Sequence, residues 1–409
     1  MQRLTDHLFR IYYGKMVAYL TAKYGYNLLD AVLDAIQEAF EAALRTWKFG
    51  NLPADQFAWL YQVAQRKLLN GLKKSATHQK HLSALAEGQD LNLAWNEEEA
   101  EDDLLYLLFF FARLPYGEKT KLAVTLYFLC GFSRKEVAKA LLSKEETIKK
   151  MLSRSKDYIK KYAVGYRRFA IHQKEEDIAY LLKVLYLLFN EGYKSSNQKV
   201  AIEFDLCFEA MRLAKLLHGT YPKHVELNAL LALQFFTAAR FPARVDSESH
   251  WVDLAEQDRK LYEPQLMKTG YYYLEQAKIY GHSLTKYYLE ALISSLHCSA
   301  LSYADTDWRT ISFLYAQLEA LEPLSLAQQV NRLIAASHFE PKNAILDALG
   351  AIEVKAAPNF LFTILMAKAY VHRLHNDWGE ARHCYEEALT KDITVLDKVF
   401  IGKKLAALS

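Results

Sequence analysis

The 409-residue sequence has few of the residues that interrupt helices, with eight prolines and fifteen glycines. Nearly every long window spaces its apolar residues as a helix does, without the alternation of a strand, so we predict an all-α protein. The apolar content of 52% is enough to bury substantial cores and excludes a disordered chain. Two or three domains are expected, because a single core rarely grows beyond roughly 250 to 300 residues.

The four cysteines lie far apart and form no CxxC pair. This pattern is typical of reduced thiols in a protein core and argues against a disulfide framework or a zinc site. No apolar run approaches the roughly 18 residues of a membrane span, and the N-terminus carries charges throughout, unlike a signal peptide. We therefore expect a cytoplasmic protein without membrane contact, metal or cofactor.

The net charge is only +3, so any affinity for nucleic acid must come from local patches. One such patch is Ser143–Lys161, SKEETIKKMLSRSKDYIKK. Its apolar residues recur at i, i+3 and i+4 from Ile148, which predicts one buried face and a cationic remainder. Ser143 with Glu146 predicts a capping box at the start of this helix. Such a helix suits the major groove of DNA.

A shorter helix is predicted just before this one. Ser133 with Glu136 forms the pattern of a capping box. The apolar residues predicted to face inward are Val137, Ala138, Leu141 and Leu142. The two segments together predict a helix-turn-helix.

Two amphipathic helices are predicted near the N-terminus. LLDAVLDAIQEAFEAALRTW keeps helical apolar spacing for four turns and carries an acidic and polar opposite face. The next helix, from Asp55 to about Lys74, has a stripe that combines an aromatic residue, amides and cations, beginning at Trp59. Such a stripe can contact phosphate oxygens and base edges. Each pattern alone also fits an ordinary solvated face, and Trp59 also fits a core position.

The order of these motifs resembles the extracytoplasmic-function sigma factors of RNA polymerase. DAIQEAFEAALRTW and FAWLYQVAQRKLLNGLKK are similar to sigma region two, and GFSRKEVAKALLSKEETIKKMLSRSKDYI is similar to region four. The resemblance implies region two at 1–80, an acidic linker at 81–103 and region four at 104–165. The chain departs from the family pattern at Gln65 and Arg66, and Lys67 stands where the family has Asn.

The resemblance implies a protein that starts transcription without being an enzyme. Its partners would be the β′ and β subunits of core RNA polymerase, double-stranded promoter DNA and the melted −10 strand. The implied polymerase contacts are Asp34, Gln37, Glu38 and Glu41. The implied −10 contacts are Phe49, Asn51, Trp59, Arg66, Asn70 and Lys73. The implied −35 contacts are Glu145, Thr147, Lys149, Lys150 and Arg154.

Residues 166–409 form a helical extension longer than both regions together. Within it, AKAYVHRLHNDWGEARHCYEEAL, near 360–390, resembles a tetratricopeptide hairpin, and Ala381, Tyr385 and Ala388 keep the spacing of that repeat. The whole order is similar to one sigma group that carries such an extension and is linked with small YCII-related proteins. The resemblance implies that the extension modulates sigma activity and that a YCII-related protein is a partner.

Polar clusters in the extension allow two interpretations. Asp and Thr before helices can be caps, and an Arg–Asp pair can be a buried brace. Alternatively, a group of charged and aromatic residues lines a regulatory groove for a ligand or a partner. This group is Arg244, Asp258, Arg259, Asp307 and Trp308.

Two other function classes stay open. The chain can be a helix-turn-helix regulator whose tetratricopeptide-like domain binds a ligand or protein, with no polymerase role. It can also be an interaction scaffold whose basic helix is a solvated face. Enzyme classes are disfavoured, because GEKTK lacks the upstream glycine and strand of a phosphate loop, and HExxH, GxSxG and GxGxxG do not occur.

Overall fold

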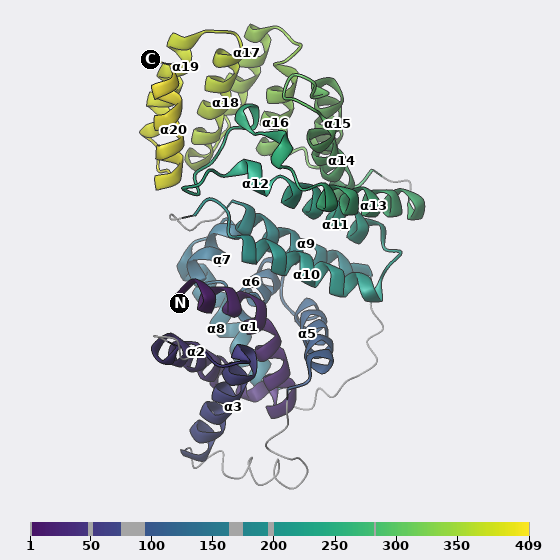
Figure 1. Cartoon of the computed structure of the whole chain (residues 1–409), viewed down its shortest axis with the longest axis vertical. Helices are drawn as coiled ribbons and strands as arrows, with labels where there is room; N and C mark the ends of the chain where they lie inside the picture. Colours follow the sequence, from purple (N-terminus) through teal and green to yellow (C-terminus); the bar gives the residue numbers. More distant parts are fainter. Residues whose placement is uncertain are drawn as a thin grey trace. The chain divides into compact units, whose positions relative to one another are not determined.

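The computed structural model describes residues 2–47, 52–74, 95–162, 175–194, 200–281 and 284–408. In these ranges the regular elements are helices, accompanied by one isolated bridge between Val245 and Trp251. The predicted all-α class is confirmed (Figure 1). Within the same ranges, no helix combines the length and apolarity that crossing a membrane requires.

The chain divides into two compact units. The first contains Met1–Gly192 and Phe204–Leu217, and the second contains Tyr193–Glu203 and His218–Ser409. The segments predicted as region two and region four therefore belong to one unit, together with most of α9 and α10. The helices that build the first unit are α1 (Gln2–Tyr24), η1 (Tyr26–Leu28), α2 (Leu29–Thr46), α3 (Gln56–Lys74), α5 (Glu97–Ala112), α6 (Glu118–Phe128), α7 (Arg134–Ala140), α8 (Glu145–Tyr162), α9 (Glu175–Tyr193) and α10 (Phe204–Thr220).

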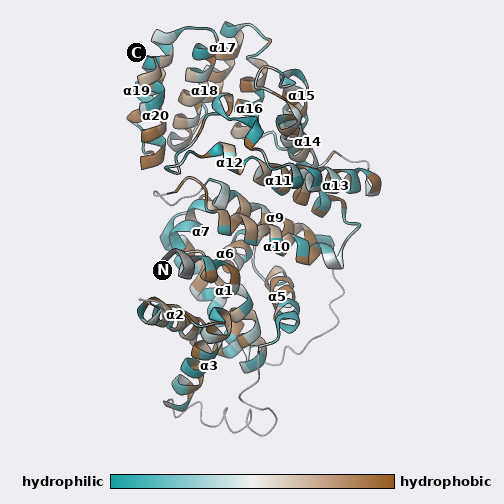
Figure 2. Cartoon of the chain, in the orientation of Figure 1, coloured by the Kyte–Doolittle hydropathy of each residue, from teal (hydrophilic) through white to brown (hydrophobic). Residues whose placement is uncertain are grey.

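Helices α2, α3 and α8 of the first unit are amphipathic, and Figure 2 colours their hydrophobic and hydrophilic residues. Helix α1 packs so closely against the residue that follows α6 that position 14 of α1 requires a glycine. A Cβ atom on Gly14 would lie 2.5 Å from the backbone oxygen of Leu129, which follows α6. The close approach of these two segments therefore depends on the missing side chain.

The acidic run that was predicted as a linker forms the first turns of α5. The Asn96 side chain caps this helix by accepting hydrogen bonds from the backbone N–H groups of Glu98 and Glu99. Carboxylates in the first turn of a helix interact favourably with its dipole, which explains why this charged run is helical. Residues 75–94 lie outside the described residues.

The segment predicted as a helix-turn-helix forms α7 and α8. The predicted capping box of α7 is confirmed, because Ser133 and Glu136 exchange both hydrogen bonds. Leu142 was expected to face inward, but it is 83% exposed with φ of 46°. This left-handed residue turns the chain out of α7, and α8 then begins at Glu145. The capping box predicted at Ser143 is therefore wrong, since Lys144 precedes the helix and its oxygen accepts from Ile148.

A charge network joins three helices of the first unit. Lys15 on α1 is almost completely buried and pairs with Glu97 and, at 3.1 Å, with Glu101 on α5. Arg212 on α10 also pairs with Glu101, at 3.0 Å, and with Glu209 on its own helix. These pairs connect α10, which lies in the predicted extension, to the predicted linker and, through Lys15, to the predicted region two.

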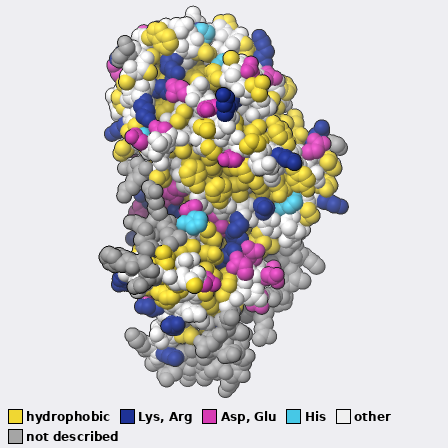
Figure 3. Space-filling model, viewed as in Figure 1, with side chains coloured by type: hydrophobic (Ala, Val, Ile, Leu, Met, Phe, Trp, Pro, Cys, Tyr) yellow, Lys and Arg dark blue, Asp and Glu magenta, His cyan; other side chains and the backbone are white. Residues whose placement is uncertain are grey.

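The second unit is a series of helical pairs. Its elements are α11 (Val225–Ala239), α12 (Phe241–Arg244), η3 (Leu254–Glu256), η4 (Arg259–Leu261), α13 (Pro264–Tyr280), α14 (Lys286–Ser299), α15 (Trp308–Leu321), α16 (Leu326–Ala336), α17 (Lys342–Glu353), η5 (Pro358–Phe360), α18 (Leu361–Leu374), α19 (Trp378–Leu389) and α20 (Val395–Ala407). On the face seen in Figure 3, hydrophobic side chains gather over α11 and α13. Exposed apolar residues of α13 include Tyr272 and Ile279.

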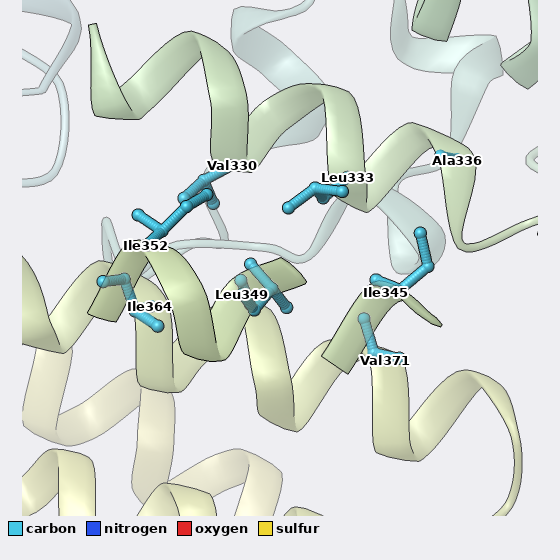
Figure 4. Packing of buried hydrophobic residues seen from close by; sticks show 9 residues of the cluster. Val330, Leu333, Ala336, Ile345, Leu349, Ile352, Ile364 and Val371 are labelled. Carbon is cyan, nitrogen blue, oxygen red and sulfur yellow. The ribbon is translucent and has the colours of Figure 1, made fainter. Parts of the chain in front are cut away.

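Successive helices of this unit share continuous apolar cores. Figure 4 shows the core in which Leu333 of α16, Leu349 of α17 and Ile364 of α18 meet. A second core joins α18, α19 and α20, and it contains Tyr385 and Ala388. Each pair buries its apolar face against the next pair, as in tetratricopeptide-like arrays. The segment near 360–390 that was predicted as a hairpin forms α18 and α19.

The last helix is fixed to the segment between α12 and α13. Lys404 of α20 has only 5% of its side chain exposed. Its ammonium group pairs with Asp253 at 2.7 Å and with Glu256. Asp253 also pairs with Arg373 of α18 at 3.2 Å. The carboxylate of Asp253 therefore holds two different helices of the second unit.

Candidate functional site

The outer face of α8 carries all five residues predicted to contact the −35 element. Ile148, Leu152 and Ile159 are buried, so the opposite side of the helix is solvent-facing. The predicted contacts on that exposed side are Glu145, Thr147, Lys149, Lys150 and Arg154. A helix with this division can present cations and hydrogen-bonding groups to phosphates and base edges.

Asp30, in the first turn of α2, binds two lysines of α8. Its carboxylate lies 2.6 Å from the Lys156 ammonium group and also pairs with Lys160. Burial opposes ionisation of Asp30, but hydrogen bonds from both lysines lower its pKa below the ordinary value. Lys149, Lys156 and Lys160 are separated by seven and four residues, so they lie along one flank of the helix. The Asp30 contact therefore covers the C-terminal part of that cationic flank.

The acidic face of α2 is exposed as predicted. Asp34, Gln37, Glu38 and Glu41 all lie on its solvent side. Glu38 pairs with Lys67 of α3 at 2.9 Å, and Gln37 donates to Glu41 at 3.2 Å. The four exposed side chains therefore carry an acidic face on which Glu38 is already paired with a lysine.

The stripe predicted on α3 is partly structural. Arg66, Asn70 and Lys73 are exposed, whereas Trp59 is half-buried and packs on Trp47 with ring centroids 5.3 Å apart. Trp59 thus joins the end of α2 to α3. Phe49 and Asn51, the other predicted −10 contacts, lie outside the described residues.

Of the five residues predicted to line a regulatory groove, four have structural roles. Asp258 caps η4 and Asp307 caps α15 through backbone hydrogen bonds. Arg259 donates to the backbone oxygens of His297, at 2.6 Å, and of Ala300. Trp308 stacks on the ring of His338 at 3.9 Å. These contacts agree with the interpretation of the four residues as helix caps and structural braces.

Arg244 alone among these five lines a cavity of the second unit, which has a volume of about 370 Å³. Its guanidinium carbon lies 4.1 Å from the centroid of the Tyr193 ring and 4.9 Å from that of Trp251. Arg244 does not pair with Asp246, the neighbour in sequence that suggested a brace. Asp246 instead pairs with Lys403 at 2.6 Å.

Comparison with known proteins shows a relative that is similar to this protein over most of the chain. The chain is 30% identical over 324 residues to an uncharacterized protein of Rhizobium meliloti (strain 1021), and the match covers 78% of this chain and 76% of that protein. The chain belongs to the family of this Rhizobium protein. Residues 178–278 also match the model of a family of unknown function, DUF6596. No solved structure matches the chain.

The segment that matches DUF6596 extends from α9 to α13. It therefore contains Arg244 and Trp251. Other cavity residues, such as Tyr370 of α18 and Phe400 of α20, come from outside this segment. The cavity is thus completed by helices that follow the DUF6596 segment.

The sequence interpretation missed two features of these sites. The Asp30 contact with α8 joins residues far apart in the chain, and no local pattern signals it. The cavity was missed because its walls come from α16, α18, α19 and α20 as well as from the segment after α12. One signal was present: Arg244 is followed by Trp251 within a short polar segment, FPARVDSESHWVD.

Proposed function

We propose that this protein is an extracytoplasmic-function-type sigma factor whose activity is modulated by its C-terminal helical unit. It binds core RNA polymerase through α2, reads the −35 element with α8 and the −10 element with α3 and the loop before it. It is not an enzyme, and it acts in the cytoplasm. A YCII-related protein is a proposed partner of the extension.

The observation that carries this proposal is the pairing of two different exposed faces in one unit. Helix α8 presents Lys149, Lys150 and Arg154, while α2 presents Glu38 and its acidic neighbours. A DNA-binding helix alone fits many regulators. An additional acidic helix face, followed by the mixed stripe of α3, fits a protein that must also bind the polymerase.

Reconstituted transcription tests the proposal directly. The full chain is added to core RNA polymerase on a library of genomic fragments, and the transcripts are sequenced. We expect initiation at a set of promoters that share two motifs. If no promoter-dependent transcript forms and the chain alone shifts a palindromic DNA, the chain is a helix-turn-helix regulator instead.

Two double variants provide reciprocal controls. Lys149→Ala with Arg154→Ala should weaken DNA binding and reduce the log–log salt slope by about 1 for each lost phosphate contact, while core binding is retained. Gln37→Ala with Glu38→Ala should weaken core binding and leave DNA binding by the chain alone unchanged. Loss of both activities in either variant would contradict the separation of the two faces.

A further inference from the structure

The cavity of the second unit has the size and lining of a small-molecule site. Its volume of about 370 Å³ falls in the usual range of roughly 300–1,000 Å³ for ligand pockets. Aromatic and aliphatic side chains form much of the wall, among them Trp251, Phe362, Met366 and Phe400. Most of the exposed lining is apolar although several polar residues contribute to it, and this favours a ligand that has an apolar body.

Arg244 enters this apolar lining without an anionic partner. Its side chain is half-buried, and its Nε atom is fully buried with no hydrogen-bond acceptor. In the part of the chain that the structure describes, no carboxylate pairs with it. Burial lowers the pKa of Arg244, which shows that the surroundings disfavour its charge. An uncompensated cation in such a place is costly unless something else supplies a negative charge.

The loop that carries Arg244 and Trp251 is held in a defined shape. The backbone N–H of Val252 donates to the oxygen of Arg244 at 2.9 Å, which closes the loop. Asp246 accepts from the backbone N–H groups of Glu248 and His250 inside it. Trp251 is thereby fixed beside the guanidinium group, whose cation–π contacts leave its in-plane N–H donors available.

The other charged residues that line the cavity are Asp253, Arg373, Asp397 and the exposed Lys194. Asp253 is paired with Arg373 and Lys404, and Arg373 also donates to the Tyr385 hydroxyl at 3.2 Å. Asp397 accepts from Thr394 in the capping box of α20. The two carboxylates in the same cavity oppose any anionic ligand, and this repulsion is twice as large for a doubly charged group such as a phosphate monoester. One negative charge is the better match to one unpaired guanidinium.

We propose that this cavity binds a small organic monoanion, in which a carboxylate is carried on an aromatic or branched apolar body. Arg244 receives the carboxylate through its N–H donors, in the bidentate geometry that guanidinium and carboxylate favour. The apolar body lies against the aromatic wall. This site does not depend on the proposed role in transcription.

Calorimetric titration of the full chain tests the charge requirement with two matched probes. These are 2-naphthylacetate and the neutral 2-naphthylacetamide, which have nearly the same shape. We expect the acid to bind at least about tenfold more tightly than the amide, because a hydrogen-bonded charge pair is worth that much or more. Equal affinities, or no binding of either probe up to about 10 mM, would overturn the proposal.

Variants locate the binding in the cavity. Arg244→Gln should abolish the preference for the acid, and Arg244→Lys should restore it only partly, because lysine lacks the planar fork. Thr363→Phe, which places a ring inside the cavity, should remove binding of both probes. Arg309→Gln is the matched control, since Arg309 also lies over a ring, that of Phe339 at 4.6 Å, but does not line the cavity.

Three results would contradict the assignment. The first is an unchanged acid preference in Arg244→Gln, and the second is unchanged binding in Thr363→Phe. The third is tighter binding of 2-naphthyl phosphate than of 2-naphthylacetate, which would show that the site prefers a dianion. Circular dichroism melting checks that each variant is folded. If Arg244→Gln does not fold, Arg244→Lys and Thr363→Phe decide the outcome.

Discussion

Asp30 occupies part of the cationic surface of α8, although the local sequence of α8 predicts that this surface is unpaired. Its carboxylate holds Lys156 and Lys160, both of which belong to the cationic part of α8. Partly exposed ion pairs of this kind contribute little stability one at a time. Under the proposed DNA-binding role of α8, their effect on function is larger, because two positive charges that would meet DNA are already paired with Asp30.

The lowered pKa of Asp30 gives a pH prediction with a definite sign. A carboxylate whose pKa is depressed by folding contributes stability above its unfolded pKa and loses it as the pH falls through the folded pKa. We expect Asp30→Asn to reduce the free energy of unfolding by about 0.5–1 kcal/mol at neutral pH. The difference from the wild type should be complete above the unfolded pKa of about 3.9 and should shrink as the pH falls below it, through the lowered folded pKa.

Chemical denaturation of both proteins across this range measures the effect. Asp34→Asn is the control, because Asp34 is exposed on the same helix and, among the described residues, makes no ion pair with the lysines of α8. A pH-independent difference between the wild type and Asp30→Asn would contradict the role of the ionised carboxylate.

At the scale of elements, helix packing depends on a few close approaches. Gly14 lets α1 lie against the backbone at Leu129, which follows α6. We expect Gly14→Ala to destabilise the first unit by roughly 1–3 kcal/mol, because the added methyl group meets a backbone oxygen that cannot rotate away. Thermal unfolding of the full chain measures the change.

Gly71→Ala is the matched control for this substitution. Gly71 lies inside α3, and a Cβ atom there would contact nothing within 4 Å. Alanine should therefore stabilise the helix by up to about 1 kcal/mol, because glycine costs more backbone entropy. Destabilisation in both variants would show that the Leu129 contact is not the cause.

The ion pairs between α2 and α8 also give a prediction about the proposed DNA binding. Asp30→Ala should release two lysines and strengthen binding of the chain to duplex DNA at low salt. The log–log salt slope should steepen by up to about 0.9 for each lysine that then contacts a phosphate. Fluorescence anisotropy between about 50 and 200 mM salt measures this slope. An unchanged slope would mean that the released lysines do not reach DNA, and Asp34→Ala controls for the lost negative charge.

At the scale of the whole molecule, much of the fold was predictable because apolar spacing is local. The helices, the Ser133 capping box and the hairpin of α18 and α19 all follow from residues within a few turns of each other. The start of α8 was not predictable in this way, because the left-handed Leu142 lengthens the turn. Contacts such as Asp30 with Lys156 depend on tertiary packing and leave no local pattern. The same is true of the cavity around Arg244.

The ion pairs that Lys404 of α20 forms in the second unit give a prediction at the scale of the whole molecule. Lys404→Met should destabilise the unit by roughly 1–3 kcal/mol, because the buried Asp253 carboxylate would keep only Arg373 as its partner. Scanning calorimetry of the full chain measures the loss. The control is Lys403→Met, the neighbouring and half-exposed lysine, for which less than about 1 kcal/mol is expected. Equal effects in the two variants would contradict the importance of burial.

The pairing of Lys404 with Glu256 also bears on how the protein is made. The two residues are separated by 148 positions, so the ribosome must translate most of the second unit between them. At about 5–20 residues per second, this takes on the order of ten seconds. During that interval the carboxylates of Asp253 and Glu256 lack the lysine that neutralises them in the finished fold. The second unit can therefore reach its final form only after synthesis of its last helix, and a nascent chain that stops short of α20 would leave this end of the protein open to proteases and chaperones.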